Sequence, residues 1–279
     1  MSRGVVYMGL AVFFFSLMNL GVKLLPGIPV FELILFRSSI AALIAYSALR
    51  AQGIPARGKR VDLLLLRGGF GFAALVLFFL TLQELPLASA VTIQYLNPLF
   101  VAILGIFLLG ERMSPLQWLW FFLSTAGIVM IKGFDYRVSI LLLAVGVLSA
   151  LFSGLAYTMV RKLKDSDHPL VVTLYFPLVT IPLSGAATAF NWVPPAGYDW
   201  LIILGMGITA QLGQLFMTKS LHLEKANIVI SMHYTGIIYG LLFGYFLFGE
   251  VYSWQSLCGI LLVLTGIAFN IFLPQKKAG

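Results

Sequence analysis

The chain has 279 residues, 60% of them hydrophobic and only 10% charged, with a net charge of +8. Soluble domains carry about 25% charged residues, so this composition excludes an ordinary soluble protein and predicts a lipid bilayer as the solvent. The positive charge lies at the ends of apolar segments, so no nucleic-acid partner is expected. The single cysteine, Cys258, excludes an intrachain disulfide and a thiolate metal cluster, and no cofactor is expected.

Ten apolar segments are long enough to cross a membrane, because spanning about 30 Å takes roughly 20 helical residues. They are residues 4–23, 30–49, 62–82, 87–109, 115–131, 138–160, 170–190, 200–220, 226–248 and 254–272. The segments are continuously apolar and do not alternate with period two, which favours helices over a β-barrel. The predicted fold is therefore an all-α integral membrane protein with ten transmembrane helices.

The first segment, 4–23, follows Arg3 and could be mistaken for a signal peptide. However, its Lys23–Leu24 pair recurs as Lys162–Leu163, deep in the chain. We therefore expect the first segment to be a structural helix that the protein retains.

The second segment, 30–49, carries Glu32 and Arg37, which we take as the only ionic residues well inside a span. Ionic groups inside a membrane normally face partners or a cavity. Glu32 lies near the end of the segment, where water could solvate it. Arg37 lies deeper, and its partner could be Glu32, a backbone carbonyl or a substrate carboxylate.

The fourth segment, 87–109, offers Gln94, Tyr95 and Asn97 as candidate substrate-binding residues. Pro98 follows them, lacks a backbone donor and clashes with the carbonyl of Gln94, so we expect a bend there. The freed carbonyl could contact substrate or only a neighbouring hydroxyl group.

The stretch from 87 to 131 recurs 139 positions later without a gap. The matches are Tyr95 with Tyr234, Gly105 with Gly244, Gly110–Glu111 with Gly249–Glu250, Ser114 with Ser253, and Gly127–Ile128 with Gly266–Ile267. Matches at a single offset of half the chain indicate a duplication, with one five-helix repeat at 1–137 and a second at 138–279.

Lysine and arginine are distributed unequally between alternate loops, which predicts the orientation in the membrane. With a cytoplasmic N-terminus, fourteen basic residues lie on the inside and three on the outside. The inside residues are Arg3, Arg50, Arg57, Lys59, Arg60, Arg67, Arg112, Arg161, Lys162, Lys164, Lys219, Lys225, Lys276 and Lys277. The outside residues are Lys23, Lys132 and Arg137. We therefore predict a cell-membrane protein, of the bacterial inner-membrane type, with both termini cytoplasmic. Because each repeat holds five spans, the second must be inverted, an arrangement that supports alternating access.

Polar side chains follow one face of the eighth span and one face of the ninth. Gln211 and Gln214 lie on the first of these faces, and Ser231 and Tyr234 lie on the second with His233 beside them. They could line a substrate cavity opposite an apolar wall of the first repeat, or they could hydrogen-bond between helices. We assign them to substrate binding, together with Arg37, Gln94, Tyr95 and Asn97.

His233 and Glu32 are the candidates for proton coupling. Imidazole changes its protonation near neutral pH. The counterpart of His233 in the first repeat is Gln94, so His233 could equally be a neutral hydrogen-bonding group.

Glu111 and Glu250 lie at helix ends, where they could act as interfacial anchors or as gate contacts. Gly236, Gly240 and Gly244 recur at every fourth position, which predicts that another helix approaches closely.

Asn97–Pro98, the run from Leu108 to Ser114, its echo at Phe248–Glu250, and Arg37 together resemble the drug/metabolite transporter superfamily, and most closely its EamA-type ten-helix exporters. The resemblance covers essentially the whole chain. It implies ten helices in two repeats and transport of a small organic metabolite. The second repeat departs from the pattern, with Ile237 in place of Pro98 and Val251 in place of Arg112.

The predicted function is a secondary transporter that exports small organic metabolites, such as amino acids or related amphipathic compounds, by alternating access around a central cavity. The chain has no His-Glu-x-x-His or Gly-x-Ser-x-Gly motif, so we do not expect an enzyme, although a membrane-embedded enzyme and a passive channel stay open as alternatives. The expected partners are a small-molecule substrate and lipid, and the sequence leaves a homodimer open.

Overall fold

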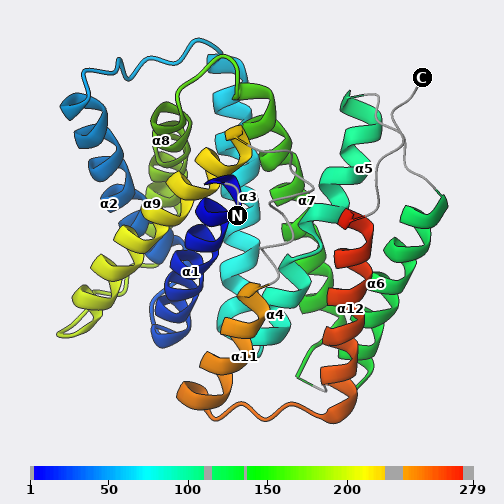
Figure 1. Cartoon of the computed structure of the whole chain (residues 1–279). Coiled ribbons are helices and arrows are strands. Elements are labelled where there is room, and N and C mark those ends of the chain that lie inside the picture. The colour runs from blue at the N-terminus through cyan, green and yellow to red at the C-terminus, as the bar shows by residue number, and fades with distance from the viewer. Residues whose placement is uncertain (1–2, 110–114, 135–136, 224–234, 273–279) are drawn as a thin grey trace.

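The computed structural model describes residues 3–109, 115–134, 137–223 and 235–272. In these ranges the chain is helical, with short connections and no strand (Figure 1). The first-repeat helices are α1 (Arg3–Leu24), α2 (Val30–Ala51), α3 (Val61–Glu84), α4 (Leu87–Gln94), α5 (Asn97–Leu109) and α6 (Pro115–Phe134). The second-repeat helices are α7 (Ile140–Leu163), α8 (Pro169–Thr188), α9 (Asp199–Leu223), α11 (Thr235–Phe248) and α12 (Trp254–Phe272).

These helices supply the ten spans, with α4 and α5 together forming the fourth. Seven helical stretches in the described ranges are long and apolar enough to cross a membrane, and α11 and α12 contribute shorter apolar stretches. Large apolar side chains point outward, including Leu141 and Phe246, each 73% exposed. Exposed apolar surface on this scale is what lipid requires, so the chain is a multi-pass membrane protein.

The fourth span is interrupted where a bend was predicted. The α-helix ends at Gln94, turns through Tyr95 and Leu96, and resumes at Asn97, directly before Pro98. Proline at that position cannot donate a backbone hydrogen bond, which explains the break. The single helix expected over 87–109 is therefore two helices, α4 and α5.

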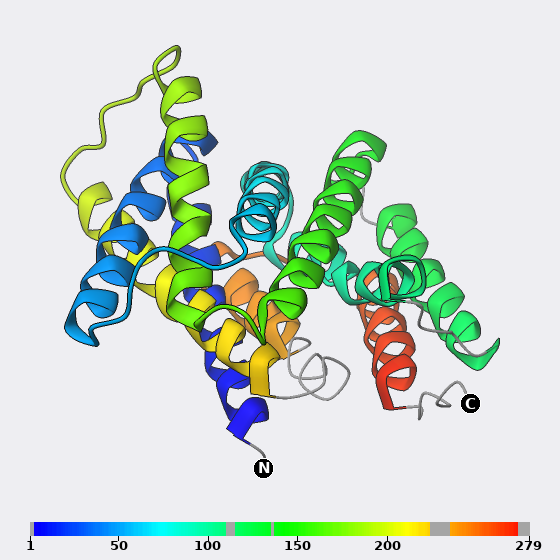
Figure 2. The same cartoon turned by 90° about the horizontal axis from the view of Figure 1, so that it is seen from above.

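The packing of the helices repeats when the two halves are exchanged. Helix α1, the first of the first repeat, packs against α9, the third of the second repeat. In the same way α3, the third helix of the first repeat, packs against α7, the first of the second. Helix α2 packs against its counterpart α8, and α6 packs against its counterpart α12. Viewed from above, the α6–α12 pair stands at one edge of the molecule and α2 with α8 at the other (Figure 2). The fold is two inverted five-helix repeats.

Two apolar clusters fill the bundle, one toward each end. One includes Leu25, Leu85 and Val138, and the other includes Met8, Leu163 and Leu221. Buried polar side chains, among them Arg37, Arg67 and Asn97, form the candidate site.

Helix α11 approaches α4 closely through its glycines, as their spacing predicted. A Cβ atom at Gly240 would lie 3.3 Å from the Cα atom of Ala88, and one at Gly236 would collide with the ring of Tyr95. Small residues at these positions therefore allow the two helices to pack backbone to backbone.

Candidate substrate cavity

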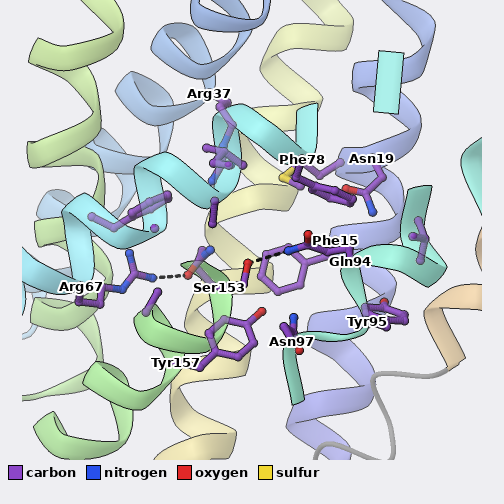
Figure 3. A pocket seen from close by; sticks show the side chains of 18 residues that line it. Phe15, Asn19, Arg37, Arg67, Phe78, Gln94, Tyr95, Asn97, Ser153 and Tyr157 are labelled. Atoms are coloured by element: carbon purple, nitrogen blue, oxygen red, sulfur yellow. Dashed lines mark hydrogen bonds between the residues drawn. The ribbon is translucent and has the colours of Figure 1, made fainter. Parts of the chain in front are cut away.

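A cavity of about 100 Å³ lies in the middle of the bundle and is lined by both repeats (Figure 3). Its walls come from α1, α2, α3, α4 and α5 of the first repeat and from α7, α8 and α9 of the second. Sites for drug-sized ligands have volumes of roughly 300–1,000 Å³. In this conformation the cavity therefore accepts a compact molecule or one end of a larger one.

Five residues expected to bind substrate line this cavity. They are Arg37, Gln94, Tyr95, Asn97 and Gln214. The break between α4 and α5 brings Tyr95 and Asn97 to the lining, because the chain turns at the cavity wall (Figure 3).

Gln94 links α4 to α7. Its Nε2 atom donates to the hydroxyl of Ser153 at 2.6 Å, and its Oε1 atom accepts from the hydroxyl of Ser149 at 2.8 Å. The amide is thereby held in one orientation at the cavity edge.

The structure does not bring Gln211 to this cavity. Gln211 is buried, and its Nε2 atom lies 3.4 Å from the hydroxyl of Thr173 on α8. A Cβ atom at Gly207, one turn earlier, would collide with Ile40 on α2. The face of α9 that carries Gly207 and Gln211 therefore packs against α2 and α8, and only Gln214 of the two glutamines reaches the cavity.

Ser231, His233 and Tyr234 lie outside the described residues, as does Glu111. Glu32 is not on the cavity. Its side chain is fully buried rather than solvated, and its Oε2 atom accepts from the backbone N–H of Val193 at 3.0 Å.

Arg67 is a cavity residue that the sequence reasoning missed. The count of basic residues in alternate loops includes Arg67, yet it is the seventh residue of α3 and only 3% exposed. Its Nη2 atom donates to Oε1 of Gln214 at 2.7 Å, and its guanidinium lies 4.3 Å from the ring centroid of Phe176. A sequence pattern could have identified Arg67 as a lining residue. The pattern is the helical spacing of Arg67, Gly71, Ala74 and Phe78, all four of which line the cavity.

Other lining residues were also missed. Asn19 comes from α1, and Ser153 and Tyr157 come from consecutive turns of α7. Ser149, Ser153 and Tyr157 are spaced four residues apart, a pattern that predicts one polar face of a helix.

Arg37 and Arg67 both make cation–π contacts with the ring of Phe176. Its guanidinium carbon lies 5.6 Å from the centroid of that ring and 5.9 Å from the centroid of Phe79. Phe176 occupies the position in the second repeat that Arg37 occupies in the first, so the two residues face each other across the pseudo-symmetry axis. Glu32 forms no ion pair with Arg37.

One end of the bundle is tied together by Glu250. Its two carboxylate oxygens accept from the backbone N–H of Leu87, the first residue of α4, at 3.1 and 2.9 Å. Glu250 also pairs with Lys23 at the end of α1, 3.6 Å away, and accepts from the hydroxyl of Tyr252. Burial and this carboxylate raise the pKa of Tyr252, which keeps the hydroxyl protonated as a donor. We name this group of contacts the Glu250 cluster.

The opposite end is tied together by Asp167. Its carboxylate accepts from the backbone N–H of Lys59 at 2.7 Å and from that of Arg60 at 3.3 Å. These contacts join the α2–α3 connection to the α7–α8 connection. Within the described residues, no group of three His, Cys, Asp or Glu side chains is placed to hold a metal ion.

Comparisons with known proteins agree with this architecture. The model of the EamA-like transporter family matches the chain twice, at residues 2–133 and 139–272. The pseudopaline exporter CntI of Pseudomonas aeruginosa is 32% identical over 278 residues, covering 97% of this chain and 96% of that protein. The S-adenosylmethionine uptake transporter of Rickettsia felis is 23% identical, covering 77% of this chain and 72% of that protein.

A solved structure shares the fold. It superposes with a TM-score of 0.72 at 19% sequence identity and covers 95% of both chains. Two matches to one family model, which together cover nearly the whole chain, and a relative above 30% identity across nearly the whole length establish the family. The chain belongs to the EamA-like transporter family.

Proposed function

We propose that this chain is a secondary transporter that exports a small organic metabolite by alternating access around the central cavity. The observation that carries the proposal is the construction of the cavity, whose walls come from both repeats. When two inverted repeats rock against each other, a site between them is exposed first to one side and then to the other. Export, rather than uptake, is supported by the similarity to the pseudopaline exporter.

The two ends of the bundle fit this scheme. The Glu250 cluster closes one end, and the Asp167 contacts close the other. Alternating access requires each set of contacts to break in turn while the other holds. Both sets of contacts lie at helix ends and in short connections.

Filling the cavity tests the proposal directly. Ala156 on α7 lines the cavity and is buried, so the change Ala156→Leu adds three carbons to a space of about 100 Å³. We expect substrate efflux and counterflow in reconstituted vesicles to fall at least about tenfold, because overpacking costs about 1–3 kcal/mol and about 1.4 kcal/mol corresponds to a factor of ten in affinity. Ala144→Leu on the exposed face of the same helix is the matched control and should transport normally.

The same assay separates a carrier from a channel or an enzyme. A carrier shows saturation and counterflow of unchanged substrate, whereas a channel shows no counterflow and an enzyme releases an altered product. Normal transport by Ala156→Leu would refute a role for this cavity.

We also propose that the Asp167 end faces the cytoplasm together with both termini, as the count of basic residues requires. In a Cys258→Ala background, Arg57→Cys in the α2–α3 connection should resist an impermeant maleimide in intact cells. Asn191→Cys in the α8–α9 connection should be labelled, and both positions are exposed. Labelling with the opposite pattern would reverse the orientation.

A further inference from the structure

We propose that the cavity binds its ligand through an anionic group, a carboxylate or a phosphate, held between Arg37 and Arg67. The inference rests on the proposed function in one respect, namely that the transported metabolite is this ligand. It adds the chemical class of the substrate and assigns a binding role to Arg67.

Both arginines are buried charges, and no acidic side chain in the described part of the chain forms an ion pair with either of them. Arg37 is 1% exposed and Arg67 is 3% exposed. Guanidinium stays protonated in proteins, and a buried charge is stable only when it is paired or fully hydrogen-bonded. Among the described residues, Nε of Arg37 and both Nε and Nη1 of Arg67 have no hydrogen-bond partner.

The acidic side chains of the described ranges either contact groups other than Arg37 and Arg67 or do not line the cavity. Glu32 bonds to Val193, Asp62 pairs with Arg60, Asp167 holds the α2–α3 connection, and Glu250 holds α4. No carboxylate from the described residues lines the cavity. The α5 helix begins at the cavity with Asn97, so its positive helix terminus adds to the same electrostatic field. The missing negative charge is therefore expected to arrive with the ligand.

The pseudo-symmetry argues against a purely structural role for these charges. At the offset of 139 residues, Arg37 corresponds to Phe176, and Arg67 corresponds to Met206. The second repeat thus builds the same helix packing with uncharged residues at both positions. Ionisable residues inside a membrane that the fold does not demand are characteristic of a substrate path.

The remainder of the cavity suits an organic molecule rather than a bare inorganic anion. Phe15, Met18 and Phe78 provide an apolar wall, and the side chains of Asn19 and Asn97 lie across the cavity from Arg67 (Figure 3). The Oδ1 atoms of both asparagines are buried and have no partner among the described residues. They can accept a hydrogen bond from an amine or hydroxyl group on the same ligand.

Binding to the purified full-length protein tests the inference. The probes are a panel of dicarboxylates, N-substituted amino acids and small phosphate monoesters, each paired with its neutral carboxamide or alcohol. We expect at least one acid to raise the melting temperature with increasing concentration, and its neutral partner to have no effect. The acid class that binds distinguishes carboxylate from phosphate recognition.

Arginine variants assign the effect to this site. Arg37→Met and Arg67→Met should each weaken binding of the active acid at least tenfold. Arg50→Met, an exposed arginine on the same helix as Arg37, should leave binding unchanged. Stabilisation of the wild-type protein by neutral compounds only, or undiminished binding of the acid in both variants, would overturn the inference.

The stability of the ligand-free protein provides an independent readout. If Arg37 serves a ligand, Arg37→Met should fold with an equal or higher melting temperature, because it removes an unpaired buried charge. A lower melting temperature with unchanged binding would show that the arginine is structural. Should the methionine variants not fold, Arg37→Lys and Arg67→Lys keep the charge without the bidentate fork and should bind at least tenfold more weakly.

This result and the proposed function can fail separately. Transport of a neutral or cationic compound that survives in both methionine variants would overturn the anion site and leave the transporter intact. Binding of an acid without saturable counterflow would instead support the site and refute the carrier.

Discussion

Replacing Glu250 by leucine is expected to open the Glu250 end of the bundle and to reduce transport by about 100-fold. The carboxylate accepts from Leu87, pairs with Lys23 and accepts from Tyr252, and only 9% of it is exposed. Removing one partner of a buried ion pair commonly costs about 3 kcal/mol or more, because it leaves the other charge uncompensated. At 1.4 kcal/mol per factor of ten, 3 kcal/mol shifts the balance between closed and open states by roughly 100-fold.

Cysteine accessibility measures this opening. Val91 lies on α4 and lines the cavity, so Val91→Cys in a Cys258→Ala background reports whether reagent reaches the cavity. We expect labelling of this cysteine to accelerate at least about tenfold when Glu250→Leu is added. Glu84→Leu is the control, since Glu84 is exposed at the same end of the bundle. Equal labelling rates with and without Glu250→Leu would contradict a gating role for the Glu250 cluster.

The change Gly127→Leu is expected to cause the largest loss of folded protein. A Cβ atom at Gly127 of α6 would lie 2.7 Å from the carbonyl oxygen of Gly259 and 2.8 Å from the backbone nitrogen of Val263, both on α12. Backbone atoms cannot move aside as a flexible side chain can, so the two helices must separate. Overpacking of this kind costs about 1–3 kcal/mol or more, against a total stability of roughly 5–15 kcal/mol.

We therefore expect Gly127→Leu to lower the melting temperature by several degrees and the membrane abundance several-fold. Fluorescence-detected gel filtration of the solubilised protein measures both quantities. Gly205→Leu on α9 is the matched control, because nothing lies within 4 Å of a Cβ atom there. Equal abundance of the two variants would show that α6 and α12 do not pack as the structure describes.

The sequence by itself determined the membrane fold and its duplication. Ten apolar segments follow from hydropathy alone, since each must satisfy its own backbone hydrogen bonds in lipid. The offset of 139 residues predicted the duplication, and the structure adds that α2 packs against its counterpart α8 and α6 against its counterpart α12. Pro98 predicted the interruption of the fourth span, because the steric effect of proline is local.

The tertiary structure alone decided which polar residues meet. Helical periodicity places Gln211 and Gln214 on similar faces of α9, yet one contacts α8 and the other contacts Arg67. A small rotation of one helix decides between a helix interface and a cavity, and periodicity does not specify which neighbour a face meets. Arg67 was assigned to a loop for a related reason. Its depth depends on where α3 begins and on which helices surround it, and those are properties of the assembled bundle.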